Sequence, residues 1–391
     1  MRHFGTVARG LRMPVIKEGD KLGDIVFNTL SEAIDEEGLR VNDKDVISIT
    51  ESIVARSQGN YASTEALAKD VLNKTGGGTV GLVFPILSRN RFLIILQSIA
   101  KGVDKLIVQL SYPSDEVGNP LVSFDDLDKN HINSVTDSFT EEEFRNLFSD
   151  LRHPFTKTDY VKLYKEAADN ISIIFSNDPR HILKYTDKVI CADIHTRART
   201  KRLLKEAGAK IVLGLDDLLN APVDGSGYNE LYGVLGSNYA KDGLLKLFPR
   251  DGQKLVEYVQ QKMYDRYGKV VEVMVYGDGA FKDPYGKIWE LADPVVSPFY
   301  TKGLIGEPNE IKFKLIADTE INASGEEANQ KMKEYIKSHK GQEKSAKTSL
   351  GTTPRNLTDL LGSLSDLTSG SGDKGTPVIY IQGYFDDYTK E

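Results

Sequence analysis

The sequence has almost no cysteine and no long apolar run. Its one cysteine, Cys191, stands in an apolar stretch, which excludes a disulfide framework and a cysteine-based zinc cluster. Such cysteine usage is typical of a reducing cytoplasm. No apolar run has the length of a membrane-spanning helix, and the first residues lack the apolar core of a signal peptide. We therefore expect a cytoplasmic protein that does not enter a membrane.

Positive charge is also scarce. The 391 residues include 50 lysines and arginines against 57 aspartates and glutamates, a formal net charge of −7. Nucleic acids and anionic membranes are bound by basic surfaces, so neither is an expected partner. The hydrophobic and charged contents, 40% and 27%, are those of an ordinary globular chain of two or three domains. A phosphate-bearing ligand must then be met by local positive charge, backbone N–H groups or a metal ion.

The common cofactor and catalytic motifs are missing as well. The middle of the chain contains no Gly-x-Gly-x-x-Gly fingerprint and no Walker loop, which argues against a standard dinucleotide or P-loop site. The six histidines are scattered without metal-ligand spacing, so a histidine-based zinc site is not expected. No Ser-His-Asp or Cys-His signature is present.

What the chain does contain is a buried strand, expected at Val271–Tyr276, that leads into a turn and two aspartates. Asp278 lies in the Gly-Asp-Gly turn, and Asp283 follows five residues later. Carboxylates held just past a strand end are suitable oxygen ligands for Mg²⁺ or Mn²⁺, and Lys287 can meet a phosphate or carboxylate as a point charge. The alternative is that Asp-Gly and Asp-Pro are only turn residues here.

From residue 79 to about 225 the pattern alternates between strand and helix. Apolar runs separated by helical segments indicate a parallel sheet with both faces covered. Ligands of such sheets bind beyond the carboxyl ends of the strands. The expected strands are Thr79–Phe84, Lys105–Ser111, Ile171–Ser176, Lys188–Asp193 and Lys210–Leu213.

One of these strand ends carries three cationic or titratable side chains. His195, Arg197 and Arg199 stand at the start of an expected helix, whose N–H groups and dipole favour an anion. The first interpretation is a phosphate or carboxylate site. The alternative is that Thr196 caps the helix while the arginines are solvated or ion-paired.

Two polar segments in the flanking parts are further candidates. Arg56 is expected in a turn rich in small residues that follows a strand, where it would be either an anion-binding cation or an ordinary exposed residue. The loop containing Gly370 and Gly372 allows close backbone approach to a ligand, unless it is only a flexible connector. In the last part of the chain, polar and apolar residues alternate over Glu310–Ile316, which is typical of a strand.

Five stretches, taken in order, resemble one known family. The first is similar to the family's opening of Gly-Leu, then Pro, then Ile-Lys-Glu-Gly-Asp, and the fourth to its Asp-Thr-x-Gly-Arg-Pro-Trp motif. The five stretches are Gly10–Leu22, Ser52–Gly59, Gly236–Gly252, Asp283–Trp289 and Leu360–Gly383. The family that they resemble is that of the coenzyme F420-0:L-glutamate ligases, or gamma-glutamyl ligases, which extend the tail of the deazaflavin cofactor.

The resemblance implies an α+β fold. Residues 1–78 and 226–391 would form a ligase-like core of the F420 gamma-glutamyl ligase type. Residues 79–225 match nothing in the family pattern, and we interpret them as an inserted α/β domain with a parallel, Rossmann-like sheet.

The resemblance also implies an activity: an amide-bond ligase, dependent on GTP (or ATP) and on Mn²⁺ or Mg²⁺, that joins glutamate to an anionic small molecule and works as a homodimer. Asp283 and Lys287 would be catalytic, with Asp283 and Asp278 as metal ligands. The anionic acceptor would be held partly by His195, Arg197 and Arg199. The remaining ligand-binding positions would be Arg56 (where the family has lysine), Gln58 (where it has glutamate), Ser237, Asn238, Gly370 and Gly372.

One departure from the family pattern concerns the metal. The family has a metal-binding aspartate two residues before the Ser-Asn pair, and this chain has Leu235, which cannot bind a cation. Either Asp278, Asp242 or an aspartate of the insert replaces it, or one metal ion is absent. The alternative function is therefore a non-catalytic nucleotide- or metabolite-binding protein on the same fold.

Overall fold

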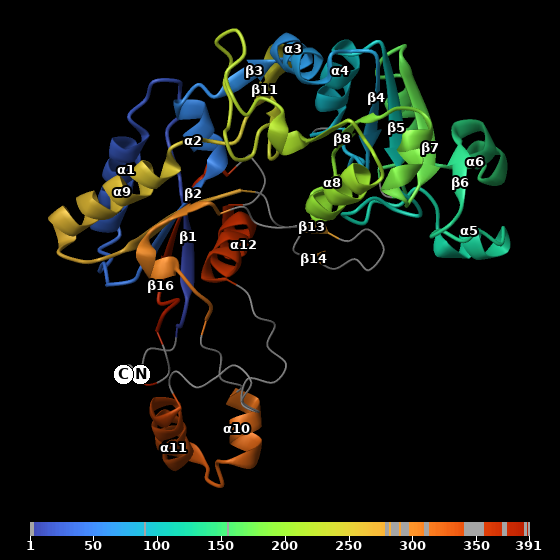
Figure 1. Cartoon of the computed structure of the whole chain (residues 1–391). Coiled ribbons are helices and arrows are strands. Elements are labelled where there is room, and N and C mark those ends of the chain that lie inside the picture. The colour runs from blue at the N-terminus through green and yellow to red at the C-terminus, as the bar shows by residue number, and fades with distance from the viewer. Residues whose placement is uncertain are drawn as a thin grey trace.

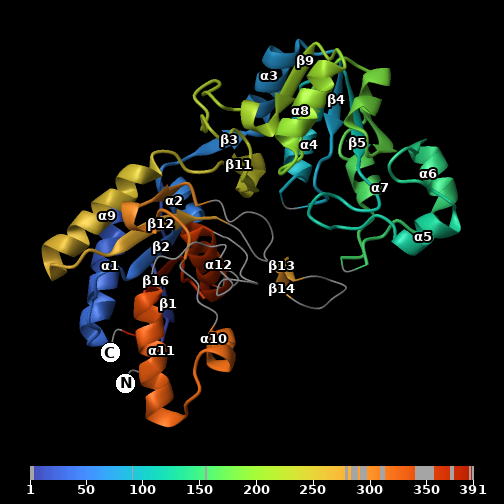
Figure 2. The same cartoon turned by 60° about the horizontal axis from the view of Figure 1, so that its bottom comes forward.

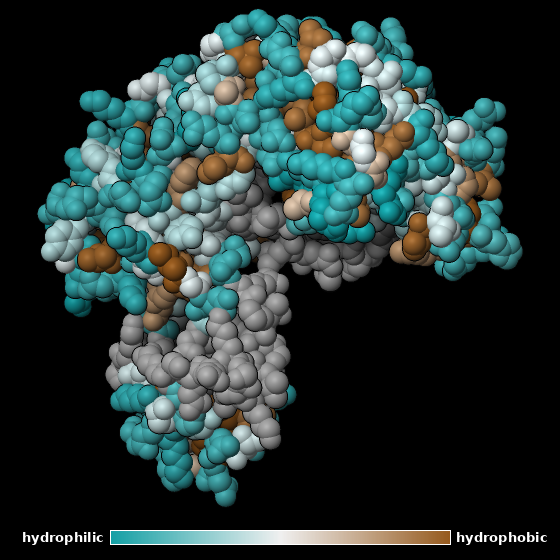
Figure 3. Space-filling view, in the orientation of Figure 1, coloured by the Kyte–Doolittle hydropathy of each residue, from teal (hydrophilic) through white to brown (hydrophobic). Residues whose placement is uncertain are grey.

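The computed structural model describes residues 4–89, 91–154, 156–277, 297–308, 313–339, 356–369, 374–386 and 389, and the backbone of 281–282 and 289–290. In this part, helices occur together with several separate sheets (Figure 1), a mixed composition consistent with the expected α+β class. None of the described helices is long and apolar enough to span a membrane. The face seen in Figure 3 is mainly hydrophilic, with apolar side chains in scattered patches.

A five-stranded sheet brings together segments from the beginning and the end of the chain. The first two strands in sequence, β1 and β2, lie on either side of the last one, β16, and are antiparallel to it. Strand β2 is also parallel to β12, the strand that precedes the predicted metal ligands. In sheet order the strands are β1 (Val7–Leu11), β16 (Val378–Gln382), β2 (Val46–Thr50), β12 (Glu272–Tyr276) and β15 (Phe299–Tyr300).

Helices cover both faces of this sheet. Helices α1 (Leu22–Glu36) and α9 (Gly252–Tyr267) pack on one face, and α12 (Leu357–Ser369) packs on the other (Figure 1). The alternation along β2 explains why: Ile47 and Ile49 join the cluster beneath α1 and α9, whereas Val46 joins the cluster beneath α12.

A second, six-stranded sheet lies in the middle of the chain. Five strands are parallel, and only the edge strand β6 is antiparallel to its neighbour. The five expected apolar strands are all present, which follows from their β-branched and apolar runs. In sheet order the strands are β6 (Ser138–Thr140), β7 (Ile171–Ser176), β5 (Lys105–Leu110), β4 (Thr79–Val83), β8 (Lys188–Cys191) and β9 (Ile211–Gly214).

The six-stranded sheet shares its hydrophobic core with residues that flank it in sequence. One face packs against α3 (Thr64–Thr75), α4 (Leu93–Lys101) and α7 (Tyr160–Lys165), and the other against α8 (Arg197–Glu206) and the 3₁₀ helix η1 (Pro179–Lys184). Leu67 and Val71 of α3 belong to the same cluster as the strands. The predicted domain limits at 78 and 225 stay predictions, but the core itself begins before residue 78.

Between the two larger sheets lies a small antiparallel one, in both views (Figures 1 and 2). Its strands are β10 (Asn238–Tyr239), β11 (Leu244–Lys246) and β3 (Tyr61–Ser63). The other elements are α5 (Phe124–Lys129), α6 (Glu141–Leu147), α11 (Gly325–Ser338), η2 (Leu215–Asp217), η3 (Lys241–Gly243), η4 (Lys302–Leu304) and the pair β13 (Phe281–Lys282) and β14 (Trp289–Glu290).

Two expectations for local structure were wrong. Residues Glu51–Ser57, expected as the end of a strand and a turn, form the helix α2. The end of the strand expected at Glu310–Ile316 belongs to the helix α10 (Phe313–Thr319), and residues 310–312 lie outside the described part. Both segments are short, and over so few residues the pattern of apolar positions does not separate helical from strand periodicity.

Candidate functional site

A cavity of about 720 Å³ opens where the N-terminal loop, α2 and the small sheet meet, and we call it the cationic cavity. Segments remote in sequence build it, because β3 pairs with β11 and α2 directly precedes β3. Four cations and one carboxylate, that of Glu18, are among its walls. The lining residues are Val15, Ile16, Lys17, Glu18, Ser52, Arg56, Tyr61, Asn238, Tyr239, Ala240, Lys241, Leu244 and Lys246.

Three of the four cations are exposed. Within the described part of the chain, the side chains of Lys17, Arg56 and Lys241 form no hydrogen bond or ion pair. Lys246 differs, since its Nζ lies 2.7 Å from Ser52 Oγ and 3.3 Å from Glu51 Oε1. The cavity therefore has one cation fixed by the fold and three that can turn toward an anion.

A second cavity of about 440 Å³ shares Val15, Ile16 and Arg56 with the cationic cavity. It lies at the carboxyl ends of β2 and β12, which contribute Thr50 and Tyr276. Its other walls come from the N-terminal loop, α2, the end of α12 and the segment before β16: Met13, Pro14, Ile53, Asp366, Ser369, Gly375, Thr376 and Pro377. Arg56, in the last turn of α2, stands between the two cavities.

The predicted metal ligands lie outside the part of the chain that the structure describes. Asp278, Asp283, Lys287, Gly370 and Gly372 lie outside the described residues, as does the side chain of Asp242. In the described part, no three histidine, cysteine, aspartate or glutamate side chains are grouped so that they could bind a metal ion. Two residues that line the second cavity, Tyr276 and Ser369, are close in sequence to Asp278 and Gly370.

The predicted Ser-Asn pair is divided between the cavity and the interior. Asn238 lines the cationic cavity, whereas Ser237 is 3% exposed. Its Oγ is buried and has no hydrogen-bond partner in the described part. Leu235, the residue that replaces the family's aspartate, packs against the hydrophobic cluster of the six-stranded sheet.

Gln58 contacts the backbone rather than lining either cavity. Its side-chain oxygen accepts a hydrogen bond of 2.9 Å from the Arg250 N–H, and its Nε2 donates to the Arg250 carbonyl. Two residues further on, the Asn60 amide donates to the carbonyls of Phe248 and Tyr228 and accepts from the Tyr228 N–H. These two amides hold the segment after β11 against the end of α2.

The start of α8, where an anion was expected, is in contact with a carboxylate of the chain itself. Glu116, from the loop after β5, accepts hydrogen bonds from the backbone N–H groups of Ile194, His195 and Thr196 at 2.5, 2.9 and 2.9 Å. Thr196 Oγ1 adds a fourth at 3.1 Å. These N–H groups directly precede the helix, which begins at Arg197, so Glu116 places a negative charge next to the positive end of the helix.

The two arginines beside it differ. Arg197 is committed, with Nε 3.0 Å from Asp216 Oδ1 and a hydrogen bond to the Asp193 carbonyl. Arg199 is exposed. Asp193 is fully buried beneath the turn, and desolvation, opposed by hydrogen bonds from Thr200 and Thr196, raises the pKa of its carboxyl group. None of the three predicted residues lines either cavity.

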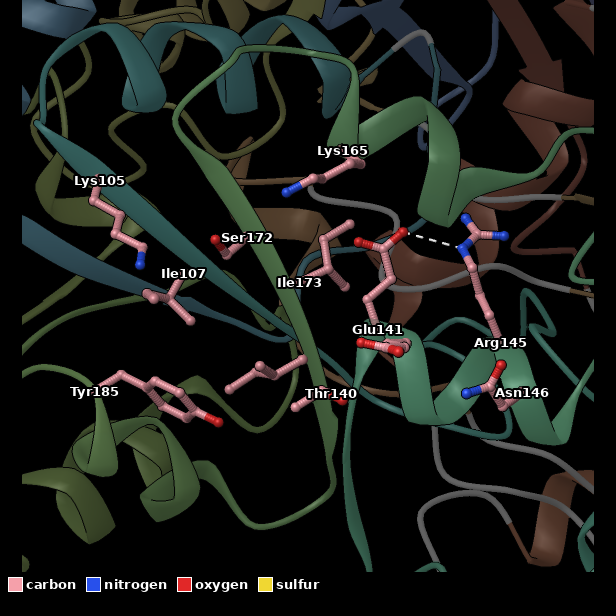
Figure 4. A pocket seen from close by; sticks show the side chains of 12 residues that line it. Lys105, Ile107, Thr140, Glu141, Arg145, Asn146, Lys165, Ser172, Ile173 and Tyr185 are labelled. Atoms are coloured by element: carbon pink, nitrogen blue, oxygen red, sulfur yellow. Dashed lines mark hydrogen bonds and ion pairs between the residues drawn. The ribbon is translucent and has the colours of Figure 1, made fainter.

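A third hollow, the sheet groove, lies on the face of β5 and β7 that α8 leaves uncovered. Figure 4 shows it between the strands and α6, with Glu141 joined to Arg145 at the rim. Lys105 and Tyr185 point into it from the opposite side. Its charges are mixed, with Lys105, Arg145 and Lys165 against Glu141 and Glu142, so it selects no ligand by charge.

Sequence reasoning missed three cations of the cationic cavity, namely Lys17, Lys241 and Lys246. A signal existed for Lys17, which belongs to the Ile-Lys-Glu-Gly-Asp stretch, and for Lys246, which interrupts the apolar run Leu-Leu-Lys-Leu-Phe. Only the pairing of β11 with β3 brings Lys246 to Arg56.

The fold and the cavities together define a mixed α/β protein with a cation-lined site suited to a small anionic ligand. The family model of F420-0:gamma-glutamyl ligase matches residues 10–383, so the chain belongs to this family and the resemblance of its five stretches is confirmed. No curated protein matches the sequence. Membership makes the chain a ligase by family and implies small-molecule substrates, glutamate among them.

Proposed function

We propose that the protein is a GTP- (or ATP-) dependent ligase that joins glutamate to the carboxylate of an anionic acceptor. A carboxylate is a poor electrophile, so one of its oxygens would first displace the nucleoside diphosphate from the γ-phosphorus to form an acyl phosphate. The amine of glutamate then attacks the acyl carbon, phosphate leaves, and the amine proton passes to solvent. Such chemistry needs an environment that holds several phosphate charges in place.

The observation that carries the proposal is the charge of the cationic cavity. The whole chain has a net charge of −7, yet this cavity collects four cations against one carboxylate. Arg56 would contact phosphate as a planar fork where the family's lysine acts as a point charge. Asn238 would contact the nucleotide beside it.

A divalent cation, Mn²⁺ or Mg²⁺, belongs to the proposal. Asp283 and Asp278 would hold it, with Lys287 nearby, and it would supply charge neutralisation at the phosphates. The support is the position of these residues after β12, whose last residue, Tyr276, lines the second cavity.

We further propose that residues 79–225 are an inserted, Rossmann-like domain and that the protein is a cytoplasmic homodimer. The strand order β7-β5-β4-β8-β9, all parallel, supports the first point, since it is the 3-2-1-4-5 order of doubly wound sheets. The family resemblance supports the homodimer, and the cysteine usage supports the cytoplasmic location.

Calorimetric titration of GTP with Mn²⁺ tests the proposal. Wild type is expected to bind, and Arg56→Ala to bind about tenfold more weakly, because a charge-assisted contact to phosphate is lost. Arg202→Ala is the matched control, since Arg202 is also a helical arginine but pairs with Glu206 on α8, away from the cavity. Absence of binding to wild type, or equal binding by Arg56→Ala, contradicts the proposal.

One observation favours a second candidate, a nucleotide- or metabolite-binding protein without catalysis. Leu235 stands where the family has a metal-binding aspartate and is packed into a hydrophobic cluster, so its position takes no part in cation binding. GTP binding without release of GDP or phosphate, in the presence of glutamate and candidate acids, would favour this candidate over the ligase.

A further inference from the structure

The contact between Gln58 and Arg250 joins two parts of the chain that both supply walls of the cationic cavity. Gln58 is the residue directly after α2, whose last turn carries Arg56. Arg250 lies four residues after Lys246, the last residue of β11. The two partners are 192 residues apart in sequence.

The contact engages both the N–H and the carbonyl group of one backbone residue, Arg250. The carbonyl oxygen of the Gln58 amide accepts from the Arg250 N–H, and the NH₂ group donates to the Arg250 carbonyl. A primary amide is the side chain that offers a donor and an acceptor side by side. A carboxylate, as in the family's glutamate at this position, offers only acceptors and would face the Arg250 carbonyl with like polarity.

Neighbouring contacts make this connection part of a clamp. Asn60 and Asn229 both donate to the Phe248 carbonyl, at 2.8 and 3.2 Å, and the Leu247 N–H donates to the Asn60 carbonyl at 2.9 Å. The segment from Leu247 to Arg250 is thereby fixed at its beginning and its end. Lys246 precedes it directly and reaches Ser52 Oγ in α2.

We propose that Gln58 is a positioning residue for the anionic ligand. By fixing Arg250 to the end of α2, it sets the spacing between Arg56 and Lys246 across the cationic cavity. Gln58 itself does not contact the ligand. This inference rests on the proposed function, because it needs a polyphosphate to occupy that cavity.

The proposal predicts that the affinity of the variant Gln58→Glu for the anionic ligand, measured relative to wild type, depends on pH. In Gln58→Glu, the ionised carboxylate cannot donate to the Arg250 carbonyl, whereas the protonated acid regains one O–H donor and restores both hydrogen bonds. The Arg250 carbonyl favours the protonated form of the new carboxyl group and the Arg250 N–H favours the ionised form, so both hydrogen bonds are present only in the fraction of molecules in which the group is protonated.

The experiment measures the affinity for inorganic triphosphate at about pH 5 and about pH 8 and expresses each variant relative to wild type at the same pH, which cancels the titration of the ligand. Gln58→Ala is expected to bind about tenfold more weakly at both pH values, the effect of losing well-formed hydrogen bonds. Gln58→Glu should show this loss at the higher pH and a smaller loss at the lower one, where a larger fraction of the carboxyl group is protonated. Gln261→Glu, which adds the same charge to an exposed position of α9, should match wild type throughout.

The outcomes distinguish a failure of the proposed function from a failure of the role proposed for Gln58. If wild type binds no triphosphate, the proposed function fails and this inference fails with it. If wild type binds but Gln58→Ala binds equally well, or the loss in Gln58→Glu is the same at both pH values, only the role of Gln58 is overturned.

Discussion

At the residue scale, Lys246 and Glu51 form a nearly buried ion pair in the wall of the cationic cavity. Their side chains are 12% and 7% exposed, and Ser52 Oγ accepts a further hydrogen bond from the lysine. Moving two charges out of water costs desolvation free energy. The attraction between well-oriented partners does little more than offset that cost. The consequence for function is that this cation is oriented before any ligand arrives, so ligand binding does not have to order it.

We predict that Lys246→Met lowers the free energy of unfolding by about 3 kcal/mol, because it leaves the Glu51 carboxylate buried without this cation. Urea unfolding followed by circular dichroism measures the change. The double variant Lys246→Met with Glu51→Gln should recover part of the loss. A single variant as stable as wild type would show that the pair contributes nothing to folding.

The buried carboxyl group of Asp193 gives a pH prediction. Desolvation raises its pKa in the folded protein above the unfolded value, and the nearby Glu116 carboxylate acts in the same direction. The stability contributed by the protonated group is complete below the unfolded pKa and is lost as the pH rises through the folded pKa. Asp193→Asn keeps a neutral side chain, so it should become more stable relative to wild type as the pH rises.

Urea unfolding at several pH values between about 4 and 8 measures this difference. Asp187→Asn is the control of opposite sign. Its hydrogen bond with Lys210 lowers the pKa of the Asp187 carboxyl group, and the stability that this contributes is present above the unfolded pKa. A parallel pH dependence of Asp193→Asn and wild type would contradict the assignment.

At the scale of elements, the N-terminus of α8 depends on a carboxylate brought by the loop after β5. Four hydrogen bonds converge on Glu116, three of them from backbone N–H groups at the positive end of the helix. Removing the carboxylate leaves these donors to water and loses the attraction to the helix dipole. The loop after β5 and the loop after β8 are thereby joined at the carboxyl edge of the six-stranded sheet.

Glu116→Ala is therefore expected to lower the free energy of unfolding by about 2 kcal/mol. Sulfate should then raise the melting temperature of this variant more than that of wild type, because the released N–H groups can bind it. The control is Glu142→Ala, which removes a carboxylate from the sheet groove and not from this helix end. If sulfate stabilises all three proteins equally, the helix end does not bind anions in the absence of Glu116.

The long elements could be predicted from the sequence, and the short ones could not. The parallel strands β4, β5 and β7 are largely apolar runs. Such runs, separated by helices, are typical of the strands of a parallel sheet that is buried on both faces. In α2, by contrast, Ile53 and Val54 form a short β-branched pair that also suits a strand. The helix forms because its apolar residues Ile53, Val54 and Ala55 become buried while Arg56 faces solvent. That choice is made by tertiary packing and not by local propensity.

At the scale of the whole molecule, the sequence indicated the family and one cation of the cavity but not the assembly of the site. Arg56 was found because it lies within a recognisable stretch. Lys241 and Lys246 reach the same cavity only through the pairing of β11 with β3, a contact between residues about 180 positions apart that no local pattern encodes. Gln58 was expected to bind the ligand, and its contact with the Arg250 backbone is equally non-local.

The same reasoning gives a prediction about how the molecule is divided. Leu67 of α3 is fully buried in the cluster of the six-stranded sheet, although it precedes that sheet in sequence, whereas Val26 of α1 is fully buried in the cluster of the five-stranded sheet. Leu67→Ala is expected to cost about 3 kcal/mol, and Val26→Ala somewhat less, because each leaves a cavity in its own core.

Hydrogen exchange distinguishes the cores, since local stability sets the exchange rate of each segment. Leu67→Ala should speed exchange in peptides covering β4 and β5 more than in those covering β1 and β16, and Val26→Ala should do the reverse. If Leu67→Ala acted chiefly on β1 and β16, α3 would belong energetically to the five-stranded unit, as its place in the sequence suggests. The expected pattern would instead show that the six-stranded unit takes its first helix from before residue 78, so that a substitution there changes the middle sheet without loosening the core that holds β1 and β16.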